Sequence, residues 1–99
     1  MIYRILFFIF FLYSSHTASE QRFITHEGIE REFLLHVPKS VNQDSPIIFV
    51  IHGYSGSAKE IEGYSGMNDI ADREGFIAVY PRGTIDNRGI TFFNVGFEF

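Results

Sequence analysis

A short apolar run followed closely by glycines constrains the fold of this chain more than any other feature. Residues 47–52 read Ile-Ile-Phe-Val-Ile-His, and Gly53 and Gly56 come next. Consecutive apolar residues, several of them β-branched, are typical of a strand buried on both faces inside a parallel sheet. Glycine allows backbone angles that a Cβ would forbid. We therefore expect a buried strand that ends in a sharp turn with exposed N–H groups.

A helix is expected to begin directly after this turn. Ser57-Ala58-Lys59-Glu60 has the spacing of a capping box, in which a Ser hydroxyl and a Glu carboxylate satisfy free backbone donors at a helix N-terminus. A buried strand, a glycine turn and a helix N-terminus together form a pocket suited to negative charge, at the place where α/β proteins usually bind ligands.

The first 19 residues have the pattern of a secretory signal. Arg4 gives a positive start, residues 5–13 are an unbroken apolar run, and Thr17-Ala18-Ser19 offers small residues for cleavage. The apolar run is about half of the roughly 20 residues that a spanning helix needs. We predict cleavage after Ser19, an extracellular product without a stable membrane span, and a domain in residues 20–99; an uncleaved membrane anchor is the alternative.

Composition excludes several classes of function. The chain of 99 residues has 12 Asp and Glu against 8 Lys and Arg, with no basic cluster, so nucleic acid is not an expected partner. It has no Cys, and its four His, at positions 16, 26, 36 and 52, lack the spacing of metal ligands. Neither a metal nor a cofactor is expected, and the oligomeric state stays open.

The rest of the chain predicts an α/β arrangement. Gly28 lies between extended runs at residues 21–26 and 29–37, which predicts a β-hairpin that ends at Pro38. Residues 39–45 are polar and are expected to form a loop. About two dozen residues separate the apolar run at 47–52 from a second one at 76–80, enough for a parallel crossover. A right-handed β-α-β unit is therefore predicted.

The crossover should contain two helical segments. The first is expected to run from Ser57 to Ile61 and to break at Gly63, and the second to pack through Met67, Ile70 and Ala71 and to end at Gly75. The acidic side chains of the second segment, Asp69, Asp72 and Glu74, are expected on a solvated face. Pro81 should end the second parallel strand, and residues 82–88 should form a polar loop that turns at Asp86-Asn87.

Four blocks of sequence carry a resemblance to a known family. Residues 31–38 (Arg-Glu-Phe-Leu-Leu-His-Val-Pro), 48–57 (Ile-Phe-Val-Ile-His-Gly-Tyr-Ser-Gly-Ser), 70–81 (Ile-Ala-Asp-Arg-Glu-Gly-Phe-Ile-Ala-Val-Tyr-Pro) and 94–96 (Asn-Val-Gly) are similar, in this order, to the N-terminal part of secreted polyhydroxybutyrate depolymerase and feruloyl esterase-like proteins. These are α/β-hydrolases that cleave esters with a Ser-Asp-His triad. The resemblance implies that Gly53 and Tyr54 supply backbone N–H groups to an oxyanion hole.

The chemistry of ester cleavage fits that implication. The tetrahedral intermediate carries a negative charge on the former carbonyl oxygen, and fixed N–H donors at roughly 3 Å stabilise it by several kcal/mol. The alternative is that the two glycines, Gly53 and Gly56, only make a tight strand-to-helix turn. Both interpretations are open at this point.

A nucleophile is harder to assign. Ser55 lies in Gly53-Tyr54-Ser55-Gly56-Ser57, which is close to the nucleophile elbow G-x-S-x-G but ends in Ser. In this fold the catalytic His follows the nucleophile along the chain, and no His follows His52. His52 is therefore expected to pack or to bind the loop, and Ser55 lacks a base.

The sequence leads to the following hypothesis. Residues 20–99 are the N-terminal portion of a secreted serine ester hydrolase, with an incomplete sheet and the oxyanion loop but without the triad, and inactive alone. The substrate of the parent enzyme would be an ester, either a polyester or an aromatic (feruloyl) ester. Two alternatives remain: a small secreted binding protein without catalysis that keeps the half-fold, and a minimal enzyme built on Ser55.

Overall fold

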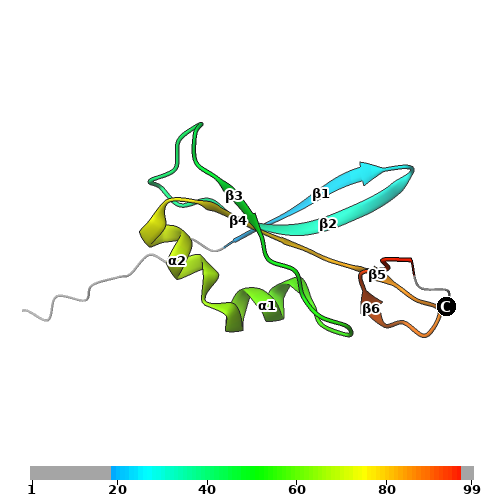
Figure 1. Cartoon of the computed structure of the whole chain (residues 1–99). Helices are drawn as coiled ribbons and strands as arrows, with labels where there is room; N and C mark the ends of the chain where they lie inside the picture. Colours follow the sequence, from blue (N-terminus) through cyan, green and yellow to red (C-terminus); the bar gives the residue numbers. More distant parts are fainter. Residues whose placement is uncertain (1–18, 97–99) are drawn as a thin grey trace, which may run out of the picture.

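The computed structural model describes residues 19–96, so the predicted signal segment lies, except for Ser19, outside the described residues. Four strands form one mixed sheet, in the order β1-β2-β4-β3, and two further strands form a small separate sheet (Figure 1). The elements are β1 (Glu20–His26), β2 (Ile29–His36), β3 (Ile47–Phe49), α1 (Ala58–Ser65), α2 (Met67–Glu74), β4 (Ile77–Pro81), β5 (Thr84–Ile85) and β6 (Thr91–Phe92). The described part of the chain is thus a small α/β domain.

The predicted hairpin at Gly28 is confirmed. β1 and β2 pair antiparallel, with His26 opposite Ile29, so only Glu27 and Gly28 form the turn. Both turn residues have positive φ, 51° and 75°. This is the signature of a type I′ turn, whose twist matches that of the two strands.

The predicted parallel pair is also confirmed. β3 and β4 run parallel, with Ile48 opposite Ala78, and both helices lie in the connection between them. β4 also pairs antiparallel with β2, so it is a central strand. Pro81 ends β4 as predicted: it is the last paired residue, opposite Phe33, and the Arg82 amide donates to the Glu32 carbonyl just beyond it.

The two helices differ in one respect from the prediction. The hydroxyl of Ser57 caps α1 by accepting from the Glu60 amide at 3.1 Å, which confirms the serine half of the predicted capping box. Gly63 does not break the helix; the break lies at Gly66, which has φ 68°. Gly75 ends α2 as predicted, with φ 78° and its amide bonded to the Ala71 carbonyl. A glycine inside a helix costs only about 1 kcal/mol, so the sequence pattern alone misplaced the break.

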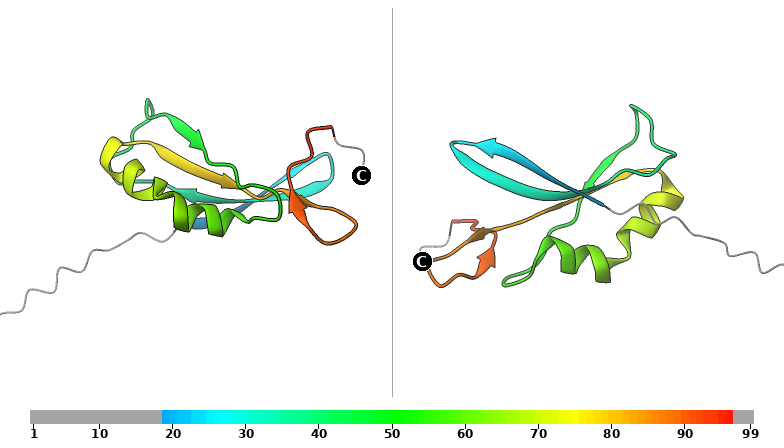
Figure 2. Two further views of the ribbon diagram at one scale, coloured as in Figure 1. Left: turned by 60° about the horizontal axis from the view of Figure 1, so that its bottom comes forward. Right: turned by 180° about the vertical axis from the view of Figure 1, so that it is seen from behind.

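The core lies between one face of the sheet and the helices. Figure 2 shows both helices on the same side of the sheet. Tyr80 and Ala78 of β4 are completely buried there, against Ala58 and Ile61 of α1 and Ala71 of α2. Every second residue of the strands points into this layer because side chains alternate along a strand.

The opposite face of the sheet is open, which corrects one prediction. The run at 47–52 was expected to be buried on both faces, but Ile47, Phe49 and Ile51 are 56%, 64% and 51% exposed. The alternate residues Ile48 and Val50 pack on the core. The helices cover only one face of the sheet, and no described element covers the other face.

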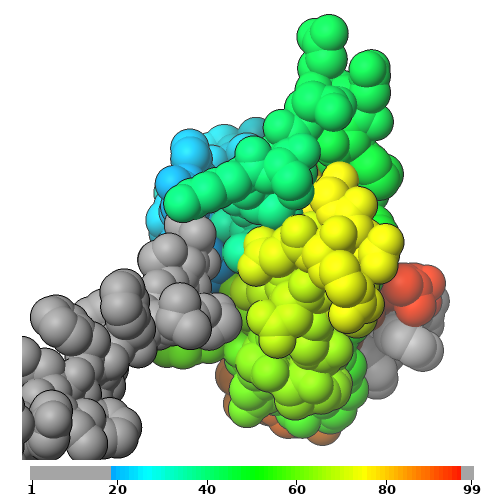
Figure 3. All heavy atoms as spheres, turned by 90° about the vertical axis from the view of Figure 1, so that its left-hand side faces the viewer, coloured from blue at the N-terminus to red at the C-terminus, as the bar shows by residue number. Residues whose placement is uncertain are grey.

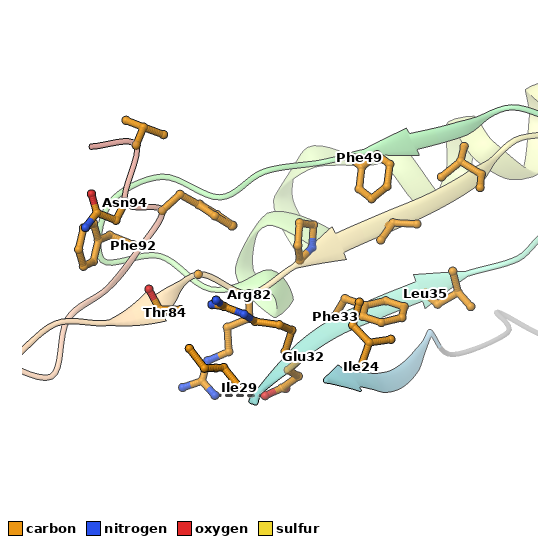
Figure 4. A pocket seen from close by; sticks show the side chains of 17 residues that line it. Ile24, Ile29, Glu32, Phe33, Leu35, Phe49, Arg82, Thr84, Phe92 and Asn94 are labelled. Carbon is orange, nitrogen blue, oxygen red and sulfur yellow. Dashed lines mark hydrogen bonds and ion pairs between the residues drawn. The ribbon is translucent and has the colours of Figure 1, made fainter. Parts of the chain in front are cut away.

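A broad apolar groove of about 970 Å³ runs along this open face. Figure 4 shows Phe33 and Leu35 of β2 and Phe49 of β3 projecting into it. β3 is also an edge strand among the described elements, so the apolar face continues to an unpaired edge. Within residues 19–96, no helix has the length and apolar character needed to cross a bilayer.

The loop between β2 and β3 is the other exposed feature of the domain. Figure 3 shows residues 37–46 standing out from the body beside α2. Asn42 organises part of this loop, since its side-chain oxygen accepts from the Asp44 amide at 2.8 Å. The loop is remote from the connection between β3 and α1, which holds the predicted site.

Candidate functional site

The loop from Val50 to Ser57 joins β3 to α1. The Val50 amide still donates to the Val79 carbonyl, at 2.8 Å, and pairing with β4 ends there. Three residues later the chain reverses, because the Gly56 amide donates to the Gly53 carbonyl at 3.1 Å. Tyr54 and Ser55 are the two central residues of this turn.

The strained position in the turn is Ser55 and not a glycine. Ser55 has φ 62°, whereas neither Gly53 nor Gly56 has a positive φ. The expectation that these glycines supply angles forbidden to other residues is therefore wrong. Gly56 lies in a tight space instead, since a Cβ there would be 3.1 Å from the Gly53 carbonyl oxygen; a Cβ on Gly53 would meet nothing within 4 Å.

Three successive amides of the loop differ in their hydrogen bonding. The Ser55 amide donates to the Thr91 carbonyl at 2.8 Å. Among the described residues, the amides of Gly53 and Tyr54 have no acceptor. Both residues line a hollow of about 360 Å³, together with the N-terminal part of α1. Two adjacent free donors beside a helix N-terminus can bind an anion.

His52 is locked in a structural role. It is only 4% exposed, and its ring lies 4.6 Å from that of Phe93. Its Nε2 accepts from the Gly83 amide at 3.0 Å, so Nε2 carries no proton, and Nδ1 donates to the Gly53 carbonyl at 2.8 Å. Both ring nitrogens are used, which agrees with the prediction that His52 packs and binds the loop and leaves it unable to act as a base.

Ser55 has no base among the described residues. No described residue makes a hydrogen bond with its hydroxyl, and the nearest His along the chain, His52, has both nitrogens engaged. Ser65, in the related Gly63–Gly66 stretch, accepts from the Met67 amide at 3.3 Å and belongs to the junction of the helices. Neither serine has the arrangement of an activated nucleophile.

The sequence reasoning missed the hairpin that supports the loop. Residues 82–88 were expected to be a polar loop, but Thr84 and Ile85 form β5, which pairs antiparallel with β6. The turn at Asp86 was predicted correctly: the Asp86 carboxylate accepts from the amides of Arg88 and Ile90 at 2.8 and 3.0 Å. The Asp-Asn-Arg-Gly stretch at 86–89 is a turn signal from which this hairpin could have been predicted.

Asp86 and Arg88, in the turn of the hairpin, have shifted pKa values. Hydrogen bonds from the Ile90 amide, and then from the backbone and side chain of Arg88, hold the pKa of Asp86 below its ordinary value. The same contact with Asp86, followed by that with Tyr54, raises the pKa of Arg88. The pair therefore stays charged around neutral pH.

A His–Asp pair lies away from the loop and was also missed. His36, at the end of β2, is 4% exposed, and its Nε2 lies 2.7 Å from Asp72 Oδ1. Asp72 was expected on a solvated face of the second helix, and its side chain is 51% exposed; through His36 it also joins α2 to the sheet. His36 Nδ1 is buried and has no hydrogen-bond partner among the described residues.

The core contains one strongly shifted group. Burial, and then the negative charge of Glu62, raises the pKa of Tyr80 to about 12. The Tyr80 hydroxyl donates to Asn68 Oδ1 at 2.6 Å, which ties α2 to β4. Among residues 19–96, no cluster of three or more His, Cys, Asp or Glu could hold a metal ion.

Comparison with known proteins gives a distant relationship to an esterase. No family model matches the chain. Over 57 residues, 58% of its length, it is 30% identical to the bifunctional acetylxylan esterase/xylanase XynS20E of Neocallimastix patriciarum. The chain spans only 8% of the length of that relative. The similarity is weak and partial, and it links the chain to esterases in the broad sense.

Proposed function

We propose that this chain is the N-terminal portion of a secreted serine ester hydrolase of the α/β-hydrolase type, similar to polyhydroxybutyrate depolymerases and feruloyl esterases. Its part in the reaction is to supply the oxyanion loop, with the amides of Gly53 and Tyr54 as donors. In α/β-hydrolases one oxyanion donor comes from the loop between the third strand and the following helix. The loop from Val50 to Ser57 occupies that place in the order of elements.

The observation that carries the proposal is the pair of free amides in an otherwise fixed turn. The Ser55 amide is bonded to Thr91, while those of Gly53 and Tyr54 have no acceptor among the described residues. Donors that are already held in place cost little reorganisation when a negative charge develops on the substrate oxygen. Gly53 and Tyr54 are exposed, so their amides are accessible to a ligand as well as to water.

The nucleophile and the base are assigned to other segments of the complete enzyme. The described residues offer no serine within reach of a free histidine nitrogen, so the chain alone is not expected to hydrolyse esters. The open apolar face and the free edge of β3 support this assignment, since exposed apolar surface of this size usually contacts further protein.

The substrate is proposed to be a carboxylic ester. The similarity to an acetylxylan esterase/xylanase favours an acyl group carried by a plant polysaccharide, of which acetyl and feruloyl esters are examples. The alcohol and acyl pockets would be formed largely by the segments that supply the triad.

An active minimal enzyme built on Ser55 is the second candidate. It is favoured by one observation, the strained φ of 62° at a serine in a strand-to-helix turn, which is a feature of nucleophile elbows. A fluorophosphonate probe separates the two: labelling that disappears in Ser55→Ala supports the second candidate, and absence of labelling supports the first.

The oxyanion role is tested by deleting a single donor. Tyr54 is the first central residue of the turn, a position where proline fits well, and proline has no N–H. We expect monomethyl phenylphosphonate, an anionic mimic of the tetrahedral intermediate, to shift the Gly53 and Tyr54 amide signals of the full chain in NMR spectra. Tyr54→Pro should bind it at least about tenfold more weakly than Tyr54→Ala, since a hydrogen bond to a charged group contributes about 1.5–3 kcal/mol.

Tyr54→Ala is the matched control because it also loses the ring but keeps the amide. Equal affinity of the two variants, or a wild-type titration that leaves the Gly53 and Tyr54 signals in place, would refute the oxyanion role. If the Gly53 and Tyr54 signals stay in place while amide signals from another surface of the chain shift, the result would favour the small non-catalytic binding protein.

A further inference from the structure

The β5–β6 hairpin and the residues that flank it make five separate contacts with the oxyanion loop, four of them uncharged. The Thr91 carbonyl accepts from the Ser55 amide at 2.8 Å, and the Gly83 amide donates to His52. The Phe93 ring packs against that of His52 at a tilt of 42°, and the Phe92 ring meets that of Tyr54 edge-on, with centroids 6.1 Å apart. The hairpin is thus placed to decide the shape of the loop.

Arg88 makes the one charged contact in this interface. Its Nη2 donates to the Tyr54 hydroxyl at 2.8 Å, and the same guanidinium donates to Asp86 Oδ2 through Nε and Nη2, at 3.2 and 3.0 Å. The Asp86 side chain is 4% exposed and is itself held by the amides of Arg88 and Ile90. Asp86 fixes the guanidinium, and the guanidinium fixes the ring of Tyr54.

We propose that Arg88 is a positioning residue for the reaction: it orients Tyr54, and through Tyr54 the two free amides, from the neighbouring hairpin. The inference rests on the proposed oxyanion role of the loop. The Tyr54 amide is one of the two donors without an acceptor among the described residues, and the next residue, Ser55, has a strained φ. A side chain anchored at its tip by Arg88 and at its ring by Phe92 restricts the rotation of the peptide groups on either side of it.

Two variants remove the same link from opposite ends. Arg88→Met deletes the guanidinium with its charge, while Tyr54→Phe deletes only the oxygen that accepts from it. If Arg88 acts through Tyr54, both variants weaken phosphonate binding by a similar factor, roughly three- to tenfold for the loss of one hydrogen bond. The double variant should then be no weaker than either single one, as expected for two groups in one interaction.

Arg73→Met is the matched control. Arg73 is also an exposed arginine bonded to a neighbouring carboxylate, that of Glu74, but it lies on α2. Its substitution removes the same net charge without touching the loop, and affinity for the phosphonate should stay within about twofold of wild type.

A second readout does not need the ligand. Hydrogen exchange of the Ser55 amide, which is bonded to Thr91, should speed up in Arg88→Met and in Tyr54→Phe, while exchange of the Ala78 amide in the buried β4 strand stays unchanged. A variant with a purely global defect would speed up both.

The outcomes separate the positioning role from its rivals. Weaker binding in Arg88→Met but not in Tyr54→Phe would show that Arg88 acts as a free charge, and the positioning role would be overturned. Unchanged binding and exchange in both variants would overturn it as well. If wild type does not bind the phosphonate, the oxyanion role fails, and Ser55 exchange still decides whether Arg88 orders the loop. Tyr54→Phe decides the matter alone if Arg88→Met does not fold.

Discussion

Gly83 gives the sharpest test of how the loop and the hairpin are joined. A Cβ built on this residue would lie 2.4 Å from the Phe92 carbonyl oxygen and 2.6 Å from its carbonyl carbon. Both atoms are backbone atoms of β6, so no side chain can rotate to make room. The Gly83 amide also donates to His52 Nε2, so any shift of this residue disturbs the buried histidine.

The cost of Gly83→Ala follows from these contacts. Ordinary carbon–oxygen contact requires β6 to retreat by about 1 Å, which is the scale of overpacking that costs about 1–3 kcal/mol. Weakening the bond to His52 adds about 1 kcal/mol. We expect the free energy of unfolding to fall by roughly 2–4 kcal/mol, a large part of the total stability of about 5 kcal/mol that is usual for a small domain.

The measurement is urea unfolding of the full chain followed by circular dichroism. Gly63→Ala is the matched control: Gly63 lies inside α1, a Cβ there meets nothing within 4 Å, and alanine should stabilise the helix by about 0.5–1 kcal/mol. Replacing glycine with alanine is thus expected to lower the free energy of unfolding at Gly83 and to raise it at Gly63. Gly83→Ala with stability equal to wild type would show that β6 does not approach Gly83 closely, and the described support for the loop would be wrong.

Three more predictions follow from other parts of the structure. Asp72→Ala should lower the free energy of unfolding by about 1–3 kcal/mol, because it leaves buried His36 without its only hydrogen-bond partner among the described residues. The control Asp69→Ala should lower it by less than about 1 kcal/mol. Equal losses of stability in thermal melts of the two variants would contradict this. Ser55→Gly should raise the free energy of unfolding by about 0.5–1 kcal/mol, because glycine adopts φ 62° without strain. The melting temperature should therefore rise slightly, and a lower one would contradict the strain at Ser55. The pKa of Tyr80 is raised in the folded protein, so the stability that it contributes is complete below pH 10.0, the ordinary pKa, and is lost as pH rises toward about 12. Ultraviolet titration should show one tyrosine that ionises later than the others, and this component should be missing in Tyr80→Phe. Its persistence in Tyr80→Phe would refute the assignment.

The sequence predicted those parts of the fold that depend on local signals. Gly28 between two extended runs gave the hairpin of β1 and β2, and Ser57 and Gly75 gave the start of α1 and the end of α2. The distance between two apolar runs gave the parallel pair of β3 and β4. Each of these signals acts over a few residues or through the length of one connection.

What the sequence could not predict depends on contacts between distant segments. The apolar run at 47–52 looked buried on both faces, but burial depends on whether a second layer covers the sheet, and the described helices lie on one side only. The bond between Asp72 and His36 was missed because the two residues lie 36 positions apart along the chain. The helix break fell at Gly66 and not at Gly63 because tertiary packing outweighs the small helix preference against glycine.

The strand-to-helix turn between β3 and α1 was predicted as a segment, but its conformation was explained wrongly in part. Gly53 and Gly56 were given the conformational role that belongs to Ser55, and the hairpin that holds the loop was predicted only as a polar loop with a turn at Asp86-Asn87. The importance of Gly83 could not be read from the sequence, because it comes from the approach of Phe92, which lies nine positions later in another strand.

Amide hydrogen exchange at three adjacent positions tests the central claim most directly. In the full chain, the Gly53 and Tyr54 amides should exchange quickly while the Ser55 amide, bonded to Thr91, is protected, and saturating monomethyl phenylphosphonate should slow the first two selectively. Protection of Gly53 and Tyr54 without the ligand would mean that both donors already have acceptors. In that case the loop would be an ordinary connection between β3 and α1, and the proposal of an oxyanion site would be contradicted.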